Sequence, residues 1–364
     1  MKIGIITIHN VSNYGAVLQS YALKEVIKDK YTVNIINFNN KHVSKSLDLI
    51  RFTPSLHGIL GTIKDILRII PRYRVINKFN NFILDELDLS EYNNKALTSF
   101  TTLISGSDQI WNPACISSNC KFRDEYFLSF ATPQQKKISY ASSCGAYEFN
   151  PEEEKVLAAY LNDYTYISSR EYESSMYLSR ITNKRVNFVL DPTLLLNKEQ
   201  WINKIKPKKI IKEKFILLYV IKKTNLLKEV VKKIKFELNL KVILVEQGLY
   251  FSNIVDKHIR DAGPADFIGL VNDAEYIVTD SFHGTTFSII FRKNFLSVSP
   301  GKNVNRIKSL LETLHLKNRL INNINDLNDV SINTDIDYHK SNIILREEIK
   351  KSKDYLFLAI ENSK

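Results

Sequence analysis

The chain has 364 residues, of which 44% are hydrophobic and 25% charged, and its formal net charge is +12 at pH 7. This composition excludes a disordered or fibrous protein and leaves room for two domains of ordinary size. The three cysteines include no CxxC pair and predict neither a disulfide framework nor a metal site. No apolar run reaches the roughly 20 residues of a membrane-spanning helix and no secretory signal is recognisable, so we expect a soluble, cytoplasmic protein.

Strands and helices alternate at the start of the chain. Residues 2–8 and 32–38 are predicted strands on either side of a helix over 15–28, which is a βαβ unit and predicts a parallel sheet. The region 39–98 is less regular, with one helix expected over 59–70, stopped by Pro71, and another over 75–87. We interpret it as a helical insertion that could cover a substrate cleft. Four further strands are predicted in this half, over 101–104, 137–141, 164–168 and 186–190.

Polar residues follow these strands where each one ends. Ligands of open α/β sheets bind outside the carboxyl ends of the strands, so we expect one common wall that contains Asp108, Gln109, Trp111, Ser143, Arg170, Glu171 and Asp191. Further cleft candidates lie where the first strand meets the first helix, at Asn13, Tyr14, Gly15 and Gln19. The guanidinium of Arg170 could bind two oxygens of a phosphate or carboxylate, with a surface ion pair as the alternative. Asp108, Gln109 and Trp111 would suit a hydroxyl-rich sugar, with a core tryptophan and a turn aspartate as the alternative.

The alternation restarts after a basic, irregular stretch at 201–214. The predicted strands and helices of this half cover 215–221, 225–238, 241–246, 263–270, 276–279, 282–291, 295–298 and 306–314. We therefore expect an α/β chain with a first Rossmann-like domain over 1–200 and a second over 201–339. The helix predicted within 340–364 could close the second domain or pack back on the first.

The most informative motif lies where the strand at 276–279 gives way to a helix. The first turn of a helix has backbone N–H groups that attract anions, and an imidazole at His283 could exchange protons with a substrate bound there. Ser281, Gly284 and Thr285 are candidates to bind an anionic donor at this turn, and Asp280 is a candidate to line the cleft. In the structural alternative, Asp280 or Ser281 would only cap the helix and the histidine would be structural.

Together these motifs resemble the polysaccharide pyruvyl transferase family. The matching stretches are SNYGAVLQSYAL from Ser12, GSDQIWNP from Gly106, YASSCG from Tyr140, SSREYES from Ser168, DPTLLL from Asp191, AEYIVTDSFHGTTFSIIF from Ala274 and NRIKSLLETLHLKNRLI from Asn305. The resemblance implies two Rossmann-like domains in a GT-B-like arrangement with the active site in an interdomain cleft. It also implies transfer of a pyruvyl group from phosphoenolpyruvate to a sugar diol, giving a ketal in surface polysaccharide biosynthesis.

The resemblance further implies roles for single residues. His283 matches the acid/base and phosphate ligand and Arg170 the donor-binding arginine, while Asp108 is a candidate to orient or deprotonate an acceptor hydroxyl. Neither a metal nor a cofactor is expected, because phosphoenolpyruvate is a co-substrate. The expected acceptor is a saccharide, which could be linked to a lipid. In that case the protein could contact the inner face of the membrane peripherally. No nucleic-acid partner is expected, since the lysines at 204–214 have no interleaved aromatic residues.

Two positions depart from the family pattern. Ser281 stands where members often have arginine in an Asp-Arg-Leu-His run, and Ala16 stands where they often have the aspartate of Asn-x-Gly-Asp. Arg306 or Lys302 could supply the missing positive charge at the donor. Alternatively, the chain is a GT-B-type glycosyltransferase that uses a nucleotide-sugar donor.

Overall fold

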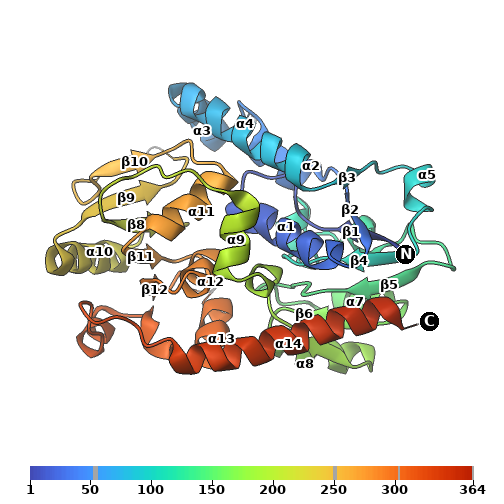
Figure 1. The fold of residues 1–364 in the computed structure, drawn as a ribbon. Coiled ribbons are helices and arrows are strands. Elements are labelled where there is room, and N and C mark those ends of the chain that lie inside the picture. The colour runs from blue at the N-terminus through green and yellow to red at the C-terminus, as the bar shows by residue number, and fades with distance from the viewer. Residues whose placement is uncertain (52–55, 249–251, 302–303, 363–364) are drawn as a thin grey trace. The chain divides into compact units, whose positions relative to one another are not determined.

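The structure, a computed structural model, describes residues 1–51, 56–248, 252–301 and 304–362 (Figure 1). The chain divides into two compact units. Unit 1 comprises Met1–Leu47, Asn80–Leu196 and Arg346–Lys364, and unit 2 comprises Asp48–Phe79 and Asn197–Leu345. Among the described helices, none is long and apolar enough to cross a lipid bilayer.

Five parallel strands form the main sheet of unit 1, in the order β3-β2-β1-β4-β5. They are β1 (Lys2–Ile6), β2 (Thr32–Ile36), β3 (Leu89–Ser90), β4 (Thr102–Ser105) and β5 (Lys136–Ser139). The central strand β1 buries Ile3 and Ile5 completely, as a parallel strand covered on both faces should. The strand order reverses between β1 and β4, and ligand crevices of doubly wound sheets form at such a switch point.

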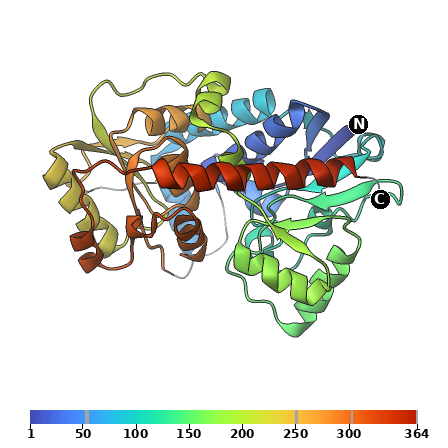
Figure 2. The same cartoon turned by 60° about the horizontal axis from the view of Figure 1, so that its bottom comes forward.

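A second, two-stranded parallel sheet extends unit 1. It consists of β6 (Ile167–Ser169) and β7 (Val186–Phe188), and single bridges such as Ser142 to Ser169 link it to the end of β5. The helices α7 (Pro151–Asn162) and α8 (Tyr172–Thr182) lie together beside it (Figure 2). The other helices of this part of the chain are α1 (Tyr14–Lys28), α2 (Lys41–Ser44), η1 (Lys45–Leu47), α5 (Asn94–Leu97), α6 (Pro113–Ile116), η2 (Asp124–Phe127) and η3 (Pro192–Leu195).

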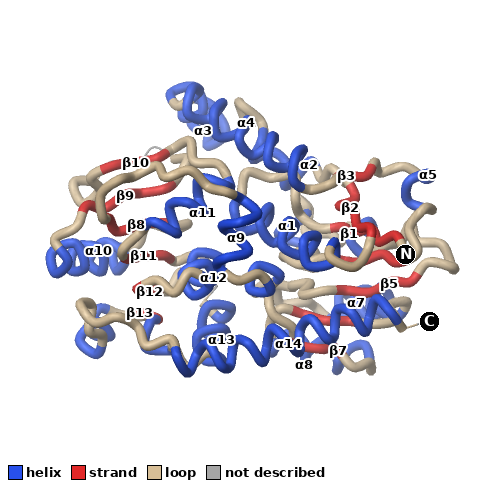
Figure 3. The backbone as a smooth tube through the Cα atoms, viewed as in Figure 1, coloured by secondary structure: helices blue, strands red, loops and turns tan. Residues whose placement is uncertain are grey.

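Unit 2 contains a six-stranded parallel sheet in the order β10-β9-β8-β11-β12-β13, which Figure 3 shows in red. Its strands are β8 (Phe215–Tyr219), β9 (Lys241–Val245), β10 (Lys257–Ile259), β11 (Tyr276–Thr279), β12 (Asn294–Val298) and β13 (Leu320–Ile321). This order is the one typical of a Rossmann fold, with its switch point between β8 and β11. The helices are α9 (Lys198–Ile205), α10 (Asn225–Leu238), α11 (Pro264–Asp273), α12 (Phe282–Ile290), α13 (Asn305–Thr313), η4 (Lys317–Arg319) and η5 (Ile324–Asp329).

Two helices contribute residues to both units. In α14 (His339–Glu361), Ser341 donates a hydrogen bond to the carbonyl of Leu314 in unit 2, and Ser352 accepts one from the N–H of Leu190 in unit 1. The other helix is α4 (Ile69–Glu86), whose residues up to Phe79 belong to unit 2 and whose residues from Asn80 belong to unit 1. It follows α3 (Leu56–Leu67).

The predicted insertion at 39–98 is divided in the structure. Residues 48–79 belong to unit 2, whereas the flanking parts belong to unit 1. Within unit 2, Lys78 donates to Asp266 at 2.7 Å, and Arg68 donates to the carbonyl of Gln247. These contacts join residues far apart in the sequence, which explains why chain order alone did not locate the boundary.

Two local predictions are corrected. Pro71 does not stop a helix but is the third residue of α4, where a missing N–H costs no intrahelical hydrogen bond. The stretch at 201–214 is not irregular from its start, because α9 continues to Ile205. Asn197 and Gln200 cap α9 reciprocally, and Trp201 is buried with its ring 5.2 Å from that of Phe287.

Candidate active site

His283 is the second residue of α12, directly beyond the carboxyl end of β11. Ser281 caps the helix, since its hydroxyl oxygen accepts a hydrogen bond from the N–H of Gly284 at 3.3 Å. The His283 side chain is buried, at 9% exposure, with its ring 5.2 Å from that of Phe282. Because the start of a helix has a positive potential, this imidazole lies where an anion is attracted.

Asp280 connects the two strands at the switch point of unit 2. Its carboxylate oxygens accept hydrogen bonds from the backbone N–H groups of Ile221 at 2.6 Å and Lys222 at 2.7 Å, beyond the end of β8. Burial raises the pKa of Asp280 above its ordinary value, although these two hydrogen bonds oppose the shift. Since both oxygens are engaged with the backbone, Asp280 positions the loop that precedes His283.

Gly284 and Thr285 support the first turn of α12. A Cβ on Gly284 would lie 2.1 Å from Oγ1 of Thr279, a distance that no real contact allows. Thr279 holds that position because its hydroxyl donates to the carbonyl of Tyr219 at 2.6 Å. The Thr285 hydroxyl lies 2.7 Å from that of Ser297 on β12. The geometry therefore gives both residues a role in shaping the turn.

Cationic groups lie near this turn. The guanidinium carbon of Arg306 is 5.7 Å from the ring centroid of Phe282, the residue before His283. Lys222 follows β8, and its ammonium donates to the carbonyl of Pro300 at 3.3 Å. Arg306 is thus placed beside the turn that lacks the family arginine, while Lys302 lies outside the described residues. Sequence reasoning missed Lys222, although a lysine pair at the end of a predicted strand was the available signal.

Arg170, in unit 1, lies among three carboxylates. Its Nη1 donates to Asp191 at 2.8 Å and its Nε to Glu171 at 3.3 Å, and its Nη2 is 3.9 Å from Asp108. Burial alone would lower the pKa of Arg170, but the three carboxylates outweigh it and raise the pKa. One guanidinium and three carboxylates leave a formal surplus of two negative charges. The arginine therefore orients carboxylates, and its contact with an anionic donor stays a prediction.

Two of these carboxylates are fixed by further hydrogen bonds. Glu171 accepts one from the hydroxyl of Ser143 at 2.7 Å. Asp191 accepts from the Thr193 hydroxyl at 2.6 Å and from the Thr193 N–H at 3.0 Å, as the cap of η3. These buried hydrogen bonds hold the loops after β5, β6 and β7 together, and the hydroxyl of Ser107, in the loop after β4, donates to Asp191 at 3.5 Å.

Asp108 differs from the other two carboxylates. Its side chain is 15% exposed, against 7% for Glu171 and 0% for Asp191. Its backbone has φ +76°, a left-handed conformation that is uncommon without glycine and that clusters at functional sites. A Cβ on nearby Gly145 would lie 2.1 Å from Oε1 of Gln109, so glycine lets the two loops approach closely. Asp108 is therefore the carboxylate of this group best placed to reach a ligand.

Trp111 is a correction to the sequence-based interpretation. The side chain is completely buried, stacked on Phe127 with ring centroids 6.0 Å apart, and its edge meets Tyr164 at 6.3 Å. It is therefore part of the hydrophobic core and not the flat surface for a sugar that the sequence suggested.

The start of α1 is also mainly structural. Asn13 caps the helix, and Tyr14, Gly15 and Gln19 are buried. The amide of Gln19 donates to the Thr7 hydroxyl at 3.0 Å, and that hydroxyl donates to the carbonyl of Ser107 at 2.6 Å. This chain of hydrogen bonds crosses the switch point of unit 1 and fixes the loop that contains Asp108.

His9 is a buried residue at this edge that sequence reasoning did not select. Its ring nitrogens lie 3.1 Å from the Thr7 carbonyl and 3.3 Å from Oδ1 of Asn37. Burial lowers its pKa below the ordinary value. Its position just after the first strand was the available signal.

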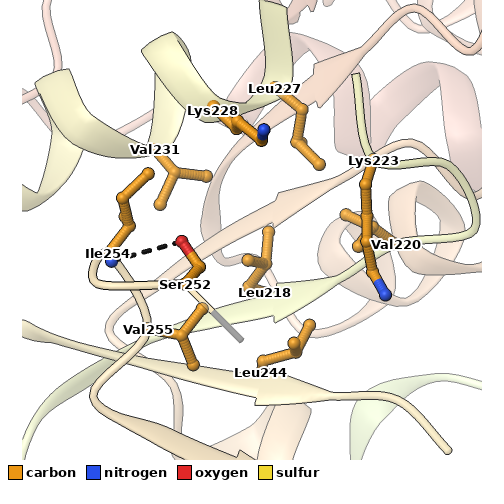
Figure 4. Close-up of a pocket in the computed structure, with 10 residues that line it drawn as sticks. All are labelled: Leu218, Val220, Lys223, Leu227, Lys228, Val231, Leu244, Ser252, Ile254 and Val255. Atoms are coloured by element: carbon orange, nitrogen blue, oxygen red, sulfur yellow. Dashed lines mark hydrogen bonds between the residues drawn. The ribbon is translucent and has the colours of Figure 1, made fainter. Parts of the chain in front are cut away.

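The described residues contain no group of three or more His, Cys, Asp or Glu that could hold a metal ion. Figure 4 shows a pocket of unit 2 between α10 and the sheet, lined mainly by aliphatic side chains such as Leu218, Val231 and Leu244. Lys223 at this pocket pairs with Glu246 at 2.7 Å. None of the candidate residues lines this pocket, so it is not the site that the sequence predicted.

A chain built of two Rossmann-like units belongs to the class of proteins with a GT-B fold. One similar solved structure is the UDP-GlcNAc 2-epimerase of Methanocaldococcus jannaschii, with 14% sequence identity and a TM-score of 0.51; the match covers 95% of this chain and 99% of that chain. Another is S. aureus MnaA with UDP, with 13% sequence identity and a TM-score of 0.50; the match covers 100% of this chain and 99% of that chain. At these identities the similarity shows the fold alone, and it confirms the predicted fold class. Comparison with curated protein sequences gives no significant match.

The family follows from the sequence itself. A family model described as polysaccharide pyruvyl transferase matches residues 13–302, a span that contains Asp108, Arg170 and His283. The chain belongs to the polysaccharide pyruvyl transferase family, as the motifs predicted. The family supports a transferase.

Proposed function

We propose that this protein transfers a pyruvyl group from phosphoenolpyruvate to two hydroxyls of a saccharide, forming a cyclic ketal. The observation that supports it most is the position of His283 in the first turn of α12, where a proton carrier lies at the positive end of a helix. A reaction that protonates a phosphorylated enol needs these two properties together.

The chemistry balances with protons alone. Protonation of the methylene carbon gives a methyl group and an electrophilic carbon, to which the first hydroxyl oxygen adds as it loses its proton. The bond from that carbon to the phosphate oxygen then breaks, and its electron pair leaves with phosphate. The second hydroxyl adds in the same way and closes the ketal, so the products are the ketal and inorganic phosphate.

In this proposal unit 2 handles the donor. His283 delivers the proton to the methylene carbon, and the start of α12 binds the phosphate. Arg306 supplies the positive charge that an arginine at position 281 would otherwise provide. Its position beside Phe282 supports this assignment. Lys222 adds a second cation on the loop that Asp280 fixes.

Asp108 in unit 1 acts on the acceptor. Its partly exposed carboxylate would orient a hydroxyl or accept its proton, while Arg170 holds the carboxylate group in place from 3.9 Å. The left-handed backbone at Asp108 is a conformation that aspartate tolerates, so the proposed role rests on the exposure of its carboxylate.

A nucleotide-sugar donor is the second candidate, and one observation favours it. Ser281 stands where the family pattern often has arginine, so the set of residues expected for phosphoenolpyruvate is incomplete in this chain. The solved MnaA structure that shares this fold contains UDP.

Thermal unfolding of the full chain with phosphoenolpyruvate, UDP-GlcNAc or inorganic phosphate separates the two donors. A ligand that binds the folded protein raises its melting temperature, and we expect phosphoenolpyruvate to do so and UDP-GlcNAc not to. A rise with UDP-GlcNAc alone would favour the glycosyltransferase.

Phosphate release from phosphoenolpyruvate in the presence of monosaccharide diols then tests the roles of the two residues. We expect His283→Gln and Asp108→Asn each to lower turnover by about 10²- to 10⁴-fold, as for a lost acid/base group. Asparagine also tolerates the left-handed backbone, so Asp108→Asn should melt like the wild type. Normal turnover by His283→Gln would overturn the mechanism.

A further inference from the structure

The helix α3 presents its large apolar residues to solvent and buries the carboxylate of Asp65. Asp65 is completely buried, whereas Leu67 is 70% exposed, Leu60 56% and Ile66 52%. An amphipathic surface helix normally has the opposite orientation, with apolar residues facing the core. Two features therefore need a physical reason: the burial of the Asp65 carboxylate and the exposure of the apolar side chains.

The buried face is held by charge. Arg51 donates to the carboxylate of Asp65 at 2.8 Å and 3.0 Å, and Arg68 donates to it at 2.7 Å. Arg72 lies 3.9 Å from the same carboxylate and is itself 3% exposed. Because a carboxylate with hydrogen-bonded cationic partners tolerates burial, these contacts fix the orientation of the helix.

The exposed face is continuous. Exposed large apolar residues recur at helical spacing along α3 and reach the start of α4, where Ile69 and Tyr73 are exposed as well. Those at helical spacing are Ile59, Leu60, Ile63, Ile66, Leu67 and Ile70. We call these six residues the apolar stripe. A contiguous apolar surface of this kind marks an interaction site for a membrane or a protein, unlike single exposed residues.

The charge around the stripe indicates what covers it. Residues 48–79 contain six basic residues and two acidic residues, Asp48 and Asp65, and Asp65 is already paired inside the protein. Lys64 is exposed next to the stripe, and on the following helix the exposed Arg74 and Lys78 are paired with Asp261 at 3.7 Å and Asp266 at 2.7 Å. A second copy of the chain would bring two such positive segments together, which is unfavourable, whereas anionic headgroups complement them.

We propose that the apolar stripe of α3 binds the surface of a membrane that contains anionic lipid. The helix would lie in the plane of the interface, with its aliphatic side chains among the acyl chains and its basic side chains at the headgroups. This inference is independent of the proposed reaction, since binding needs neither donor nor acceptor. It would bring a transferase to the surface where lipid-linked saccharides are found.

Co-sedimentation of the full chain with vesicles tests the proposal. We expect binding to mixed phosphatidylglycerol and phosphatidylcholine vesicles, and weak binding to phosphatidylcholine alone. Leu67→Glu should lower the partition coefficient at least about tenfold, because an inserted leucine is replaced by a charge. Phe236→Glu is the matched control, since Phe236 is 87% exposed on α10 of the same unit. This variant should bind vesicles like the wild type.

Circular dichroism should show the same melting temperature for both variants, because both side chains are exposed. Equal loss of binding in the two variants, or no binding to anionic vesicles, would overturn the proposal. A vesicle-free dimer that Leu67→Glu dissociates would also overturn it, since a second copy would then cover the stripe.

Discussion

In unit 1, Arg170 donates from Nη1 to Oδ2 of Asp191 at 2.8 Å, with side-chain exposures of 2% and 0%. Two charges buried this deeply are stable only if their remaining donors and acceptors are satisfied. The other carboxylate oxygen of Asp191 accepts a hydrogen bond from the Thr193 hydroxyl, and Nε of Arg170 donates one to Glu171. The pair therefore acts as the central link between loops that follow four different strands.

Arg170→Met should destabilise the protein by about 3–5 kcal/mol, because it leaves buried carboxylates without their cation. Urea unfolding followed by circular dichroism measures this change. Arg180→Met is the matched control, since Arg180 is 71% exposed with Glu154 at 3.6 Å, and such a pair contributes about 1 kcal/mol at most. If Arg170→Met instead kept wild-type stability and raised only the KM for phosphoenolpyruvate, Arg170 would be a donor-binding residue, as its motif first suggested.

Gly284→Ala should destabilise unit 2 by about 1–3 kcal/mol through overpacking, since its Cβ would meet Oγ1 of Thr279 at 2.1 Å. Gly61→Ala is the control, because a Cβ there meets no atom within 4 Å, and replacing a helical glycine stabilises by about 0.5–1 kcal/mol. The double variant Thr279→Ala/Gly284→Ala should recover part of the loss in urea unfolding. No recovery would show that the clash with Thr279 is not the cause.

The sequence predicted the elements around His283 well. The strand at 276–279 and the helix at 225–238 have the bounds of β11 and α10 in the structure. Both begin and end at abrupt changes between apolar and polar residues, so local chemistry defines them. The placement of His283 at the start of a helix depends only on such local signals, which is why it could be predicted.

Other features depend on contacts between distant residues. Trp111 follows a strand and was predicted to face a ligand, but it fills the space between Phe127 and Tyr164. The spacing of apolar residues correctly predicted an amphipathic helix near 59–70. Spacing alone does not say which face is buried, and here the partners of Asp65 decide it. Strand order and the division of residues 39–98 are set in the same nonlocal way.

The buried carboxylate of Asp65 should make the stability of unit 2 depend on pH in the acid range. Burial alone would raise the pKa of Asp65, but hydrogen bonds from Arg51 and Arg68 outweigh it and hold the pKa below the ordinary value. A lowered pKa in the folded state stabilises the protein fully above the unfolded pKa of about 3.9. This stabilisation begins to decline as the pH falls below that value and is lost once the pH has fallen through the lowered pKa of the folded state.

Asp65→Asn removes this contribution. Above about pH 5 the variant should melt at a lower temperature than the wild type. Below about pH 4 the gap should narrow, because the Asp65 carboxylate of the unfolded wild-type chain then takes up a proton, which stabilises the unfolded state, while the folded state keeps its ion pairs until the pH reaches the lowered pKa. Melting temperatures of both proteins across this range, measured by circular dichroism, test the prediction. Curves that stay parallel down to the acid end would mean that the ion pairs of Asp65 do not stabilise the fold, and the orientation of α3 would then need another cause.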